Sequence, residues 1–283
     1  KGDLSPYSAA DDTWLCGGSS LVYGSTLEFV DGAISLSDSD FTSLSLPGLR
    51  DVTGGLTISQ NDDLTEVRLP ALEVIGGNLY VYNNDDGDFS TFNMSALRRV
   101  DGYVYIYSND NMRWQGLPAL EEVGGYFQIR YSPYYWNNYD DDESPGDFGS
   151  LRSIGGGLEV EYNRLGSTRD MSRLETVGEQ LEIVQNDGLT DVQLPLLNST
   201  GAYLKIYDNE ALSSLDISSL SSVNSEGWDW YWCDGSGDTE DVCIYNNDLE
   251  SSRTSVEALA ASALSVYTDS CLVFADGPEN CYW

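Results

Sequence analysis

The sequence predicts a mainly β protein, a solenoid of about eight coils with roughly 23 residues each. Three features support this prediction: an apolar–x–apolar pattern that returns at a nearly constant interval, glycine before it, and asparagine three residues after its second apolar residue. That second apolar position recurs at Leu36, Ile58, Val81, Ile106, Ile129, Val160, Ile183 and Ile206. The intervals are 22–25 residues, apart from one of 31. Since one such coil cannot bury its own interior, neighbouring coils have to stack.

Each part of the repeat predicts one part of a coil. The apolar–x–apolar pattern has the period of a short strand with two side chains facing inward. The glycines before it, as at Gly54–Gly55 and Gly76–Gly77, allow a tight corner that leads into the strand. A Leu-Pro-x-Leu motif then carries the chain across a second apolar face, at residues 46–49, 69–72, 117–120 and 194–197.

The recurring asparagines predict a stacked ladder at the point where the chain leaves each strand. Their side-chain amides can bond backbone groups there. The candidate ladder residues are Asn61, Asn84, Asn109, Asn163, Asn186 and Asn209. The alternative is that these asparagines are ordinary surface turn residues.

The two ends depart from the repeat. We expect an N-terminal cap at residues 1–30, the solenoid at 31–224 and a C-terminal cap at 225–283. Val242–Ile244 resembles a ninth strand, and Thr254 with Glu257 forms a capping box before a helix expected near 255–267. That short helix would seal the end of the core.

Four of the five cysteines lie in the last 51 residues and predict a disulfide-stapled C-terminal cap. They are Cys233, Cys243, Cys271 and Cys281. Pairing each with its nearer neighbour closes two short loops, although fifteen pairings of four among five cysteines are possible. Cys16 then remains as the odd thiol, buried or bridging to another chain.

The charge balance narrows the range of functions. The chain carries 47 acidic and 13 basic residues, for a net charge of −34, and has no histidine. Such a field opposes binding to nucleic acids and anionic membranes, and it favours cations, basic peptides or neutral sugars. Without histidine, Ser-His and Cys-His nucleophiles are excluded.

The localisation expected from the sequence is extracellular or at the cell surface. No stretch approaches 18 uninterrupted apolar residues, so we expect no transmembrane segment. The chain begins Lys-Gly-Asp without an initiator methionine, which suggests a mature secreted product whose signal peptide was removed. Disulfide bonds fit that compartment.

Residues 69–84, with the sequence LPALEVIGGNLYVYNN, resemble the receptor L domain family. These leucine-rich β-helical modules bind ligands in receptor ectodomains of the insulin and EGF types, and similar repeats occur in fungal and bacterial surface proteins. The resemblance extends over about residues 30–224. It implies a right-handed β-helix and a binding role without catalysis. The cysteine-rich modules and the kinase of those receptors have no counterpart in this sequence. The resemblance is therefore used only for the expected fold and the expected binding role.

Strand alternation predicts a tyrosine-rich binding face. Residues between the inward positions point outward, and coil stacking places equivalent residues about 5 Å apart. The expected face contains Tyr80, Tyr82, Tyr103, Tyr105, Tyr107, Tyr126 and Arg130. An exposed aromatic patch is typical of a contact surface. The alternative is cross-coil packing that only stabilises the sheet.

The 31-residue interval contains an aromatic and acidic insertion at residues 131–143, which predicts a second contact element. Its aromatic candidates are Tyr134, Tyr135, Trp136 and Tyr139. Asp140, Asp141, Asp142 and Glu143 are weak calcium candidates, because no acidic run in the chain matches the twelve-residue calcium loop. A disordered acidic loop is the alternative, and no other cofactor is expected.

Three functions are compatible with these observations. The first is a non-catalytic secreted or surface-displayed binding or adhesion module, whose partner is a protein, a glycan or another copy of itself. The second is a structural subunit that self-assembles into an extracellular filament, surface layer or matrix. The third, less favoured, is a carbohydrate hydrolase that uses the neighbouring outward carboxylates of Glu159, Glu161 and Glu182.

Overall fold

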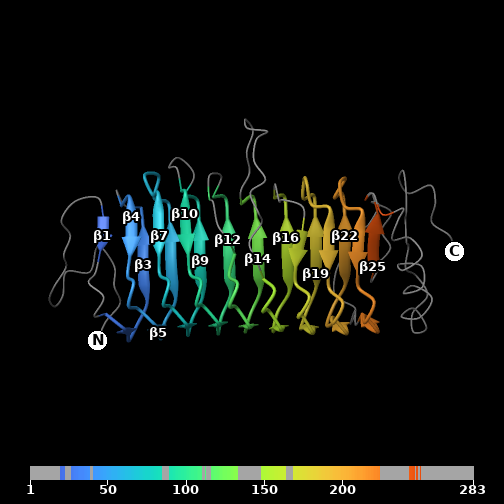
Figure 1. The fold of residues 1–283 in the computed structure, drawn as a ribbon, viewed down its shortest axis with the longest axis horizontal. Helices are drawn as coiled ribbons and strands as arrows, with labels where there is room; N and C mark the ends of the chain where they lie inside the picture. The colour runs from blue at the N-terminus through green and yellow to red at the C-terminus, as the bar shows by residue number, and fades with distance from the viewer. Residues whose placement is uncertain are drawn as a thin grey trace.

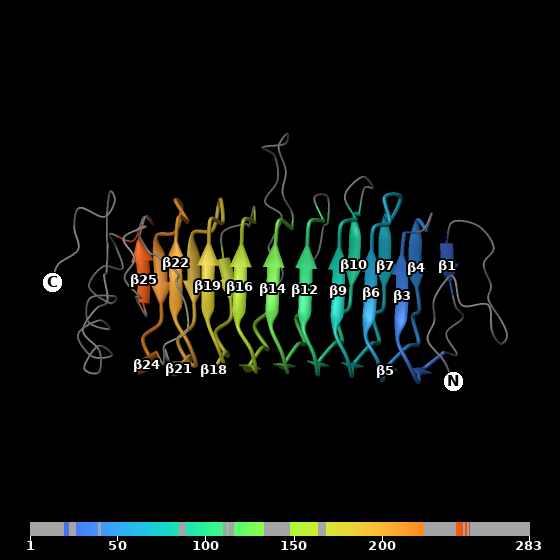
Figure 2. The same cartoon turned by 180° about the vertical axis from the view of Figure 1, so that it is seen from behind.

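The computed structural model is a β-solenoid of about seven turns, and none of its described residues lies in a helix. The structure describes residues 20–22, 27–38, 41–84, 89–109, 112, 116–132, 148–163, 168–223, 242–245, 247 and 249. In Figures 1 and 2 the strands lie side by side along one long axis. Most of both expected caps lies outside the described residues, including the helix near 255–267.

The longest strands form one side of the solenoid, a nine-stranded parallel sheet that we call the long sheet. Its strands, in order, are β3 (Ile34–Ser37), β6 (Leu56–Ser59), β9 (Leu79–Tyr82), β12 (Val104–Tyr107), β14 (Phe127–Arg130), β16 (Leu158–Glu161), β19 (Leu181–Val184), β22 (Leu204–Tyr207) and β25 (Val242–Tyr245). Neighbours pair without a register shift, as Val104 does with Leu79 and with Phe127. All eight strands expected from the repeat are present, and β25 adds the ninth.

Two further sides complete each turn. One is a nine-stranded sheet of two-residue strands: β2 (Phe29–Val30), β5 (Asp51–Val52), β8 (Val74–Ile75), β11 (Arg99–Val100), β13 (Glu122–Val123), β15 (Ser153–Ile154), β18 (Thr176–Val177), β21 (Ser199–Thr200) and β24 (Ser222–Val223). The other is split into two sheets, β1 (Ser20–Val22), β4 (Ser43–Ser45), β7 (Glu66–Arg68) and β10 (Thr91–Asn93), then β17 (Thr168–Asp170), β20 (Asp191–Gln193) and β23 (Ser214–Asp216). Every pairing is parallel, as coil-on-coil stacking requires.

A single apolar core runs through the stack, from Val30 to Leu249. Both apolar side chains of each of the eight predicted strands from β3 to β22 are buried, as in Leu79 and Val81, which have no exposed surface. In the Leu-Pro-x-Leu motif the second leucine N–H donates to the carbonyl of the first, at 3.2 Å from Leu49 to Leu46. Both leucines of that turn are buried. The motif therefore adds a second apolar wall to the core.

The glycines before the strands lie in the bend expected there, but they also serve a second purpose. Positive φ among the described glycines occurs at Gly32, Gly116 and Gly188, and not in the pairs that precede the strands. What those positions require is close approach between turns. A Cβ atom on Gly178 would overlap the carbonyl oxygen of Gly155, and one on Gly201 would overlap that of Gly178. Glycine is needed there because any side chain would push the turns apart.

The left-handed backbone falls instead on the residue that follows each of eight strands of the long sheet. These residues are Asp38, Gln60, Asn83, Ser108, Tyr131, Tyr162, Gln185 and Asp208, with φ between 47° and 55°. The chain therefore bends sharply at the same place in every turn. The ladder residue follows directly after this bend in all the turns from β6 to β22.

The six predicted asparagines form one buried column, each with at most 1% of its surface exposed. Asn186 shows the pattern: its Nδ2 donates to the Val160 carbonyl at 2.9 Å and to Asn209 Oδ1 at 3.1 Å, and its backbone N–H donates to the same Oδ1 at 3.0 Å. Each amide thus joins three successive turns.

The ladder also contains two members beyond the six candidate asparagines. In the turn of β14 its place is taken by Ser132, whose hydroxyl accepts from the Asn109 N–H at 3.1 Å and whose own N–H donates to Asn163 Oδ1 at 2.9 Å. At the far end, Asn247 donates to the Ile206 carbonyl at 2.9 Å and accepts from Asn209. The column is therefore continuous across the 31-residue interval.

We predict that Asn186→Ala lowers the free energy of unfolding by about 1–3 kcal/mol, because it leaves buried backbone groups without a partner. Chemical denaturation measures this change. Asn198→Ala is the matched control, since Asn198 is exposed directly before β21 and should change stability by less than about 0.5 kcal/mol. An equally small effect at Asn186 would contradict a structural role for the ladder.

Candidate functional site

The candidate site lies on the outward face of the long sheet, where the non-core residues of each strand stand in columns. The in-register pairing aligns Tyr80 of β9 with Tyr105 of β12, then with Gln128, Glu159, Glu182 and Lys205 of the following strands. A second column runs through Tyr82, Tyr107, Arg130, Glu161, Val184 and Tyr207. The face therefore changes along the solenoid from tyrosines to charged residues.

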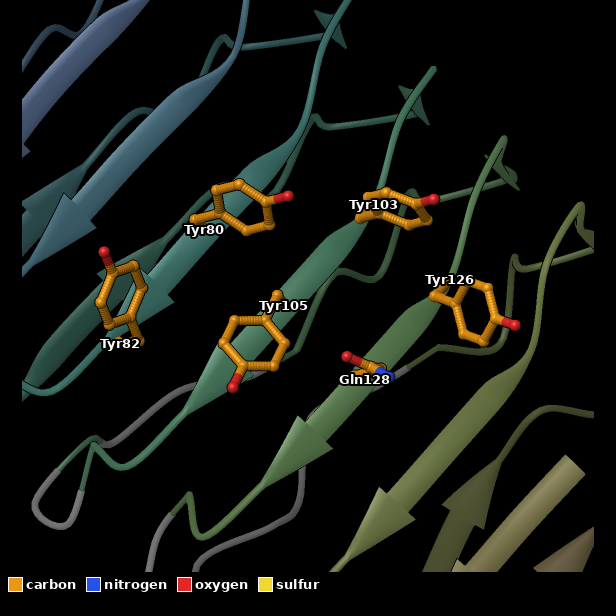
Figure 3. Close-up of a pocket in the computed structure, with 6 residues that line it drawn as sticks. All are labelled: Tyr80, Tyr82, Tyr103, Tyr105, Tyr126 and Gln128. Atoms are coloured by element: carbon orange, nitrogen blue, oxygen red, sulfur yellow. The ribbon is translucent and has the colours of Figure 1, made fainter.

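Five tyrosine rings and one amide enclose an open hollow of about 470 Å³, within the size range of small-ligand pockets. We call it the tyrosine hollow. It is lined by Tyr80 and Tyr82 of β9, Tyr105 of β12 and Gln128 of β14. Tyr103 and Tyr126, the residues directly before β12 and β14, complete the lining. Figure 3 shows these side chains on three neighbouring strands, standing on one face of the sheet.

The rings support one another, so the face is less exposed than the sequence suggests. Tyr105 stacks on Tyr107 at 5.6 Å between ring centres and meets Tyr80 edge-on at 6.1 Å. Tyr103 and Tyr126 lie 5.7 Å apart. Tyr103 is 44% exposed, whereas the other four rings are half-buried against their neighbours. Both alternatives for the tyrosines therefore have support, because the rings pack across turns and also line an open hollow.

Hydrogen bonds around the hollow hold two of its tyrosine hydroxyls in place. Asn78 Nδ2 donates to the Tyr80 hydroxyl at 2.8 Å, and the Tyr126 hydroxyl donates to Glu179. Burial raises the pKa of Tyr80 and Tyr105, and burial together with the Glu179 hydrogen bond raises the pKa of Tyr126 to about 12. These phenols are therefore neutral at physiological pH.

Next to the hollow lies a charged cluster formed by Arg130, Glu159, Glu161, Glu182 and Lys205. Glu159 is 5% exposed and accepts three hydrogen bonds, from Gln128 at 2.5 Å, Arg130 at 2.5 Å and Gln180 at 2.6 Å. The sequence placed Glu159 and Glu161 on the outer face, and they do extend from it, but neighbouring long side chains bury them. Glu159 acts as the centre that holds Gln128 and Arg130 in place.

Proton sharing reduces the repulsion between the stacked carboxylates. Burial and a hydrogen bond with Glu182 raise the pKa of Glu161 to about 8, although Arg130 opposes the shift. Arg130 pairs with Glu161 at 3.3 Å as well as with Glu159. Lys205 is 4% exposed, and burial lowers its pKa. The raised pKa favours the protonated form of Glu161, which weakens the repulsion among the stacked carboxylates.

The structure brings the predicted face residues together, with Tyr107 stacked on Tyr105 and Arg130 paired with two glutamates of the charged cluster. The loop candidates Tyr134, Tyr135, Trp136 and Tyr139 and the calcium candidates at residues 140–143 lie outside the described residues, as do Cys16, Cys233, Cys271 and Cys281. The backbone of Cys243 is described and pairs with Lys205 in β22. Within the described residues, no three acidic or cysteine side chains are grouped so as to hold a metal ion.

Strand alternation in the sequence places Gln128 on the outward face but does not mark it as a binding residue, and it does not single out Asn78. Gln128 lines the hollow and Asn78 holds the Tyr80 hydroxyl, yet neither residue type suggests a site when taken alone. The available signal was register, because Gln128 stands in the same column as Tyr105. That signal has value only once the neighbouring column is known to be aromatic.

In the part of the chain that the structure describes, no helix is long and apolar enough to cross a membrane. Comparison of the chain with known protein families, with curated proteins and with solved structures finds no significant match. The residues and their geometry therefore carry the functional argument.

The charged cluster predicts a pH dependence of stability. Because the pKa of Glu161 is higher in the folded chain than in the unfolded one, its contribution is complete below about pH 4.5 and is lost as pH rises through about 8. Between pH 6 and 9 the free energy of unfolding should fall by about 1–2 kcal/mol, after allowance for solvent screening. The chain has no histidine, the residue that ordinarily titrates in this window.

Glu161→Gln keeps the neutral form of this side chain and should flatten the profile, which denaturation at a series of pH values measures. Glu175→Gln removes an exposed carboxylate and should leave the slope as in the parent chain. If the fall persists in Glu161→Gln, the titrating group is a different one.

Proposed function

We propose that this protein is a non-catalytic binding module, secreted or displayed at a cell surface, and that its ligand occupies the tyrosine hollow. The observation that carries the proposal is the hollow itself. Five tyrosine rings lie on an outer sheet face that no other described segment covers. Tyrosine is favoured at binding sites because its ring offers a large contact area at low entropy cost and its hydroxyl adds a polar contact.

The arrangement of this face supports binding better than catalysis. Glu159, which holds Gln128 at the hollow, is occupied by three donors, and Glu161 is paired with Glu182 and Arg130. Paired carboxylates that cleave a sugar need one group free to attack or to activate water. The hydrolase hypothesis therefore receives less support than the binding module.

The resemblance of residues 69–84 to the receptor L domain family points the same way. It extends the proposal to a right-handed solenoid. The capping box and the cysteine positions, which lie outside the resemblance, extend it to a C-terminal cap with a helix near 255–267 and two cysteine pairs. The large negative charge and the cysteine content are the basis for placing the protein outside the cell. Self-assembly into a filament or matrix is the alternative, in which the ligand of the face is a second copy of the chain.

Replacing Tyr82 and Tyr105 together by serine should weaken binding at least tenfold while shifting the melting temperature by only a few degrees. Fluorescently labelled protein is applied to an array of immobilised oligosaccharides and an array of peptides, and the strongest binder is then titrated. Tyr207→Ser is the matched control, since Tyr207 stands in the same column as Tyr82 but on β22, away from the hollow.

Light scattering of the same three proteins at increasing concentration tests the self-assembly alternative. Assemblies that vanish in the double variant would favour the structural subunit. If the parent chain binds neither array, or if the double variant binds normally and melts far lower, the tyrosines only pack the sheet and the proposal is wrong.

A further inference from the structure

The amide of Gln128 presents its hydrogen-bond acceptor, and not its donor, to the tyrosine hollow. The Gln128 Nε2 donates to Glu159 at 2.5 Å, so the orientation of the amide is set by a carboxylate that can only accept. Figure 3 shows the Gln128 oxygen directed toward Tyr105 and the nitrogen directed away from it. The hollow therefore presents a carbonyl acceptor surrounded by ring faces.

The rings are electron-rich and uncharged. The raised pKa values of Tyr80, Tyr105 and Tyr126 keep these phenols protonated, so they attract a cation through the ring face rather than as phenolates. The hydrogen bond from Tyr126 to the Glu179 carboxylate adds electron density to its ring. Neighbouring Glu159 and Glu179 add negative potential at the edge of the hollow.

The repeat contains an internal example of a cation at the corresponding place. Lys205 stands in the column of Tyr105 and Gln128, and Tyr203 precedes it by two residues as Tyr103 precedes Tyr105. The Lys205 ammonium lies 4.4 Å from the centre of the Tyr203 ring, inside the range of a cation–π contact. This geometry of the turn therefore has room for a cation over that ring.

In the turns of β12 and β14 the rings of Tyr103 and Tyr126 are present, while the neighbouring column holds Tyr105 and Gln128 in place of lysine. Arg130 is the basic residue of β14, and it pairs with Glu159 and Glu161. The hollow thus has the aromatic and acceptor groups of a cation site, and the cation has to come from a partner.

We propose that the tyrosine hollow binds an arginine or lysine side chain of a basic polypeptide segment laid across β9, β12 and β14. This inference rests on the proposed function, since it concerns the same hollow. A polypeptide is favoured over a free small cation because the hollow is open on a sheet face and a single small ion would leave most of the rings uncovered. The net charge of −34 would also attract a segment with several basic residues.

The test measures fluorescence anisotropy of a labelled twelve-residue peptide of glycine, serine and three arginines, at 50 mM and 200 mM salt. Its partner peptide carries citrulline, which has the shape of arginine without the charge. We expect the arginine peptide to bind at least tenfold more tightly. Tyr103→Leu should weaken that binding about fivefold or more, and Tyr103→Phe should retain it, because phenylalanine keeps the ring face.

These substitutions leave the net charge unchanged, so a loss cannot come from weaker general attraction to the acidic chain. Tyr207→Leu, in the same sheet but outside the hollow, should bind like the parent chain. Equal affinity for the arginine and citrulline peptides would overturn the inference. So would unchanged affinity for the arginine peptide in Tyr103→Leu, or tighter binding of free choline than of the arginine peptide.

Failure of this inference is distinguishable from failure of the proposed function. A neutral oligosaccharide that binds the parent chain and not the Tyr82→Ser, Tyr105→Ser variant would keep the binding module and exclude the cation. If none of the array ligands and neither peptide depends on the tyrosines, both are wrong.

Discussion

The unshifted parallel register between successive turns is the constraint on which the rest of the molecule depends. Each long strand pairs residue for residue with its neighbours in the sheet, so every position of the repeat becomes a column along the solenoid. A residue type that packs well in one turn can then recur about every 23 residues. A residue that packs poorly or repels its column neighbours has to be offset by side chains of the adjacent turns. Both the core and the outer face follow from this alignment.

Inside the solenoid the columns solve two problems of backbone packing. The ladder from Asn61 to Asn247 gives hydrogen-bond partners to buried backbone groups. These groups lie where the chain leaves the long sheet, next to the left-handed residue of each turn. The glycine columns let the backbones of adjacent turns approach so closely that no Cβ atom fits. Ser132 shows how much variation is tolerated, because its hydroxyl replaces an asparagine amide while the flanking hydrogen bonds remain.

On the outer face the same alignment places residues of the same type next to one another. This stabilises the tyrosines, whose rings pack together, and destabilises the glutamates, whose charges repel. Tyrosines of β9 and β12 pack edge-on and stacked, whereas Glu159 and Glu182 are brought directly opposite each other. Arg130, Lys205 and the shared proton of Glu161 offset that repulsion. The tyrosine hollow lies where the aromatic columns give way to this cluster, and Gln128 belongs to both: it lines the hollow and donates to Glu159.

Periodicity in the sequence alone determined the mainly β solenoid, the strand positions, the inward apolar pairs and the columns of the outer face, because each depends on a short local spacing that recurs from turn to turn. The tertiary structure decided which of those features become a site. The ladder role of Ser132, the burial of Glu159 and Glu161, and the place of Gln128 in the hollow all depend on residues one or more turns away, 23 to 31 positions along the chain. Glycine was recognised in the sequence, but its reason was not, since the requirement comes from the backbone of the next turn and not from its own φ angle.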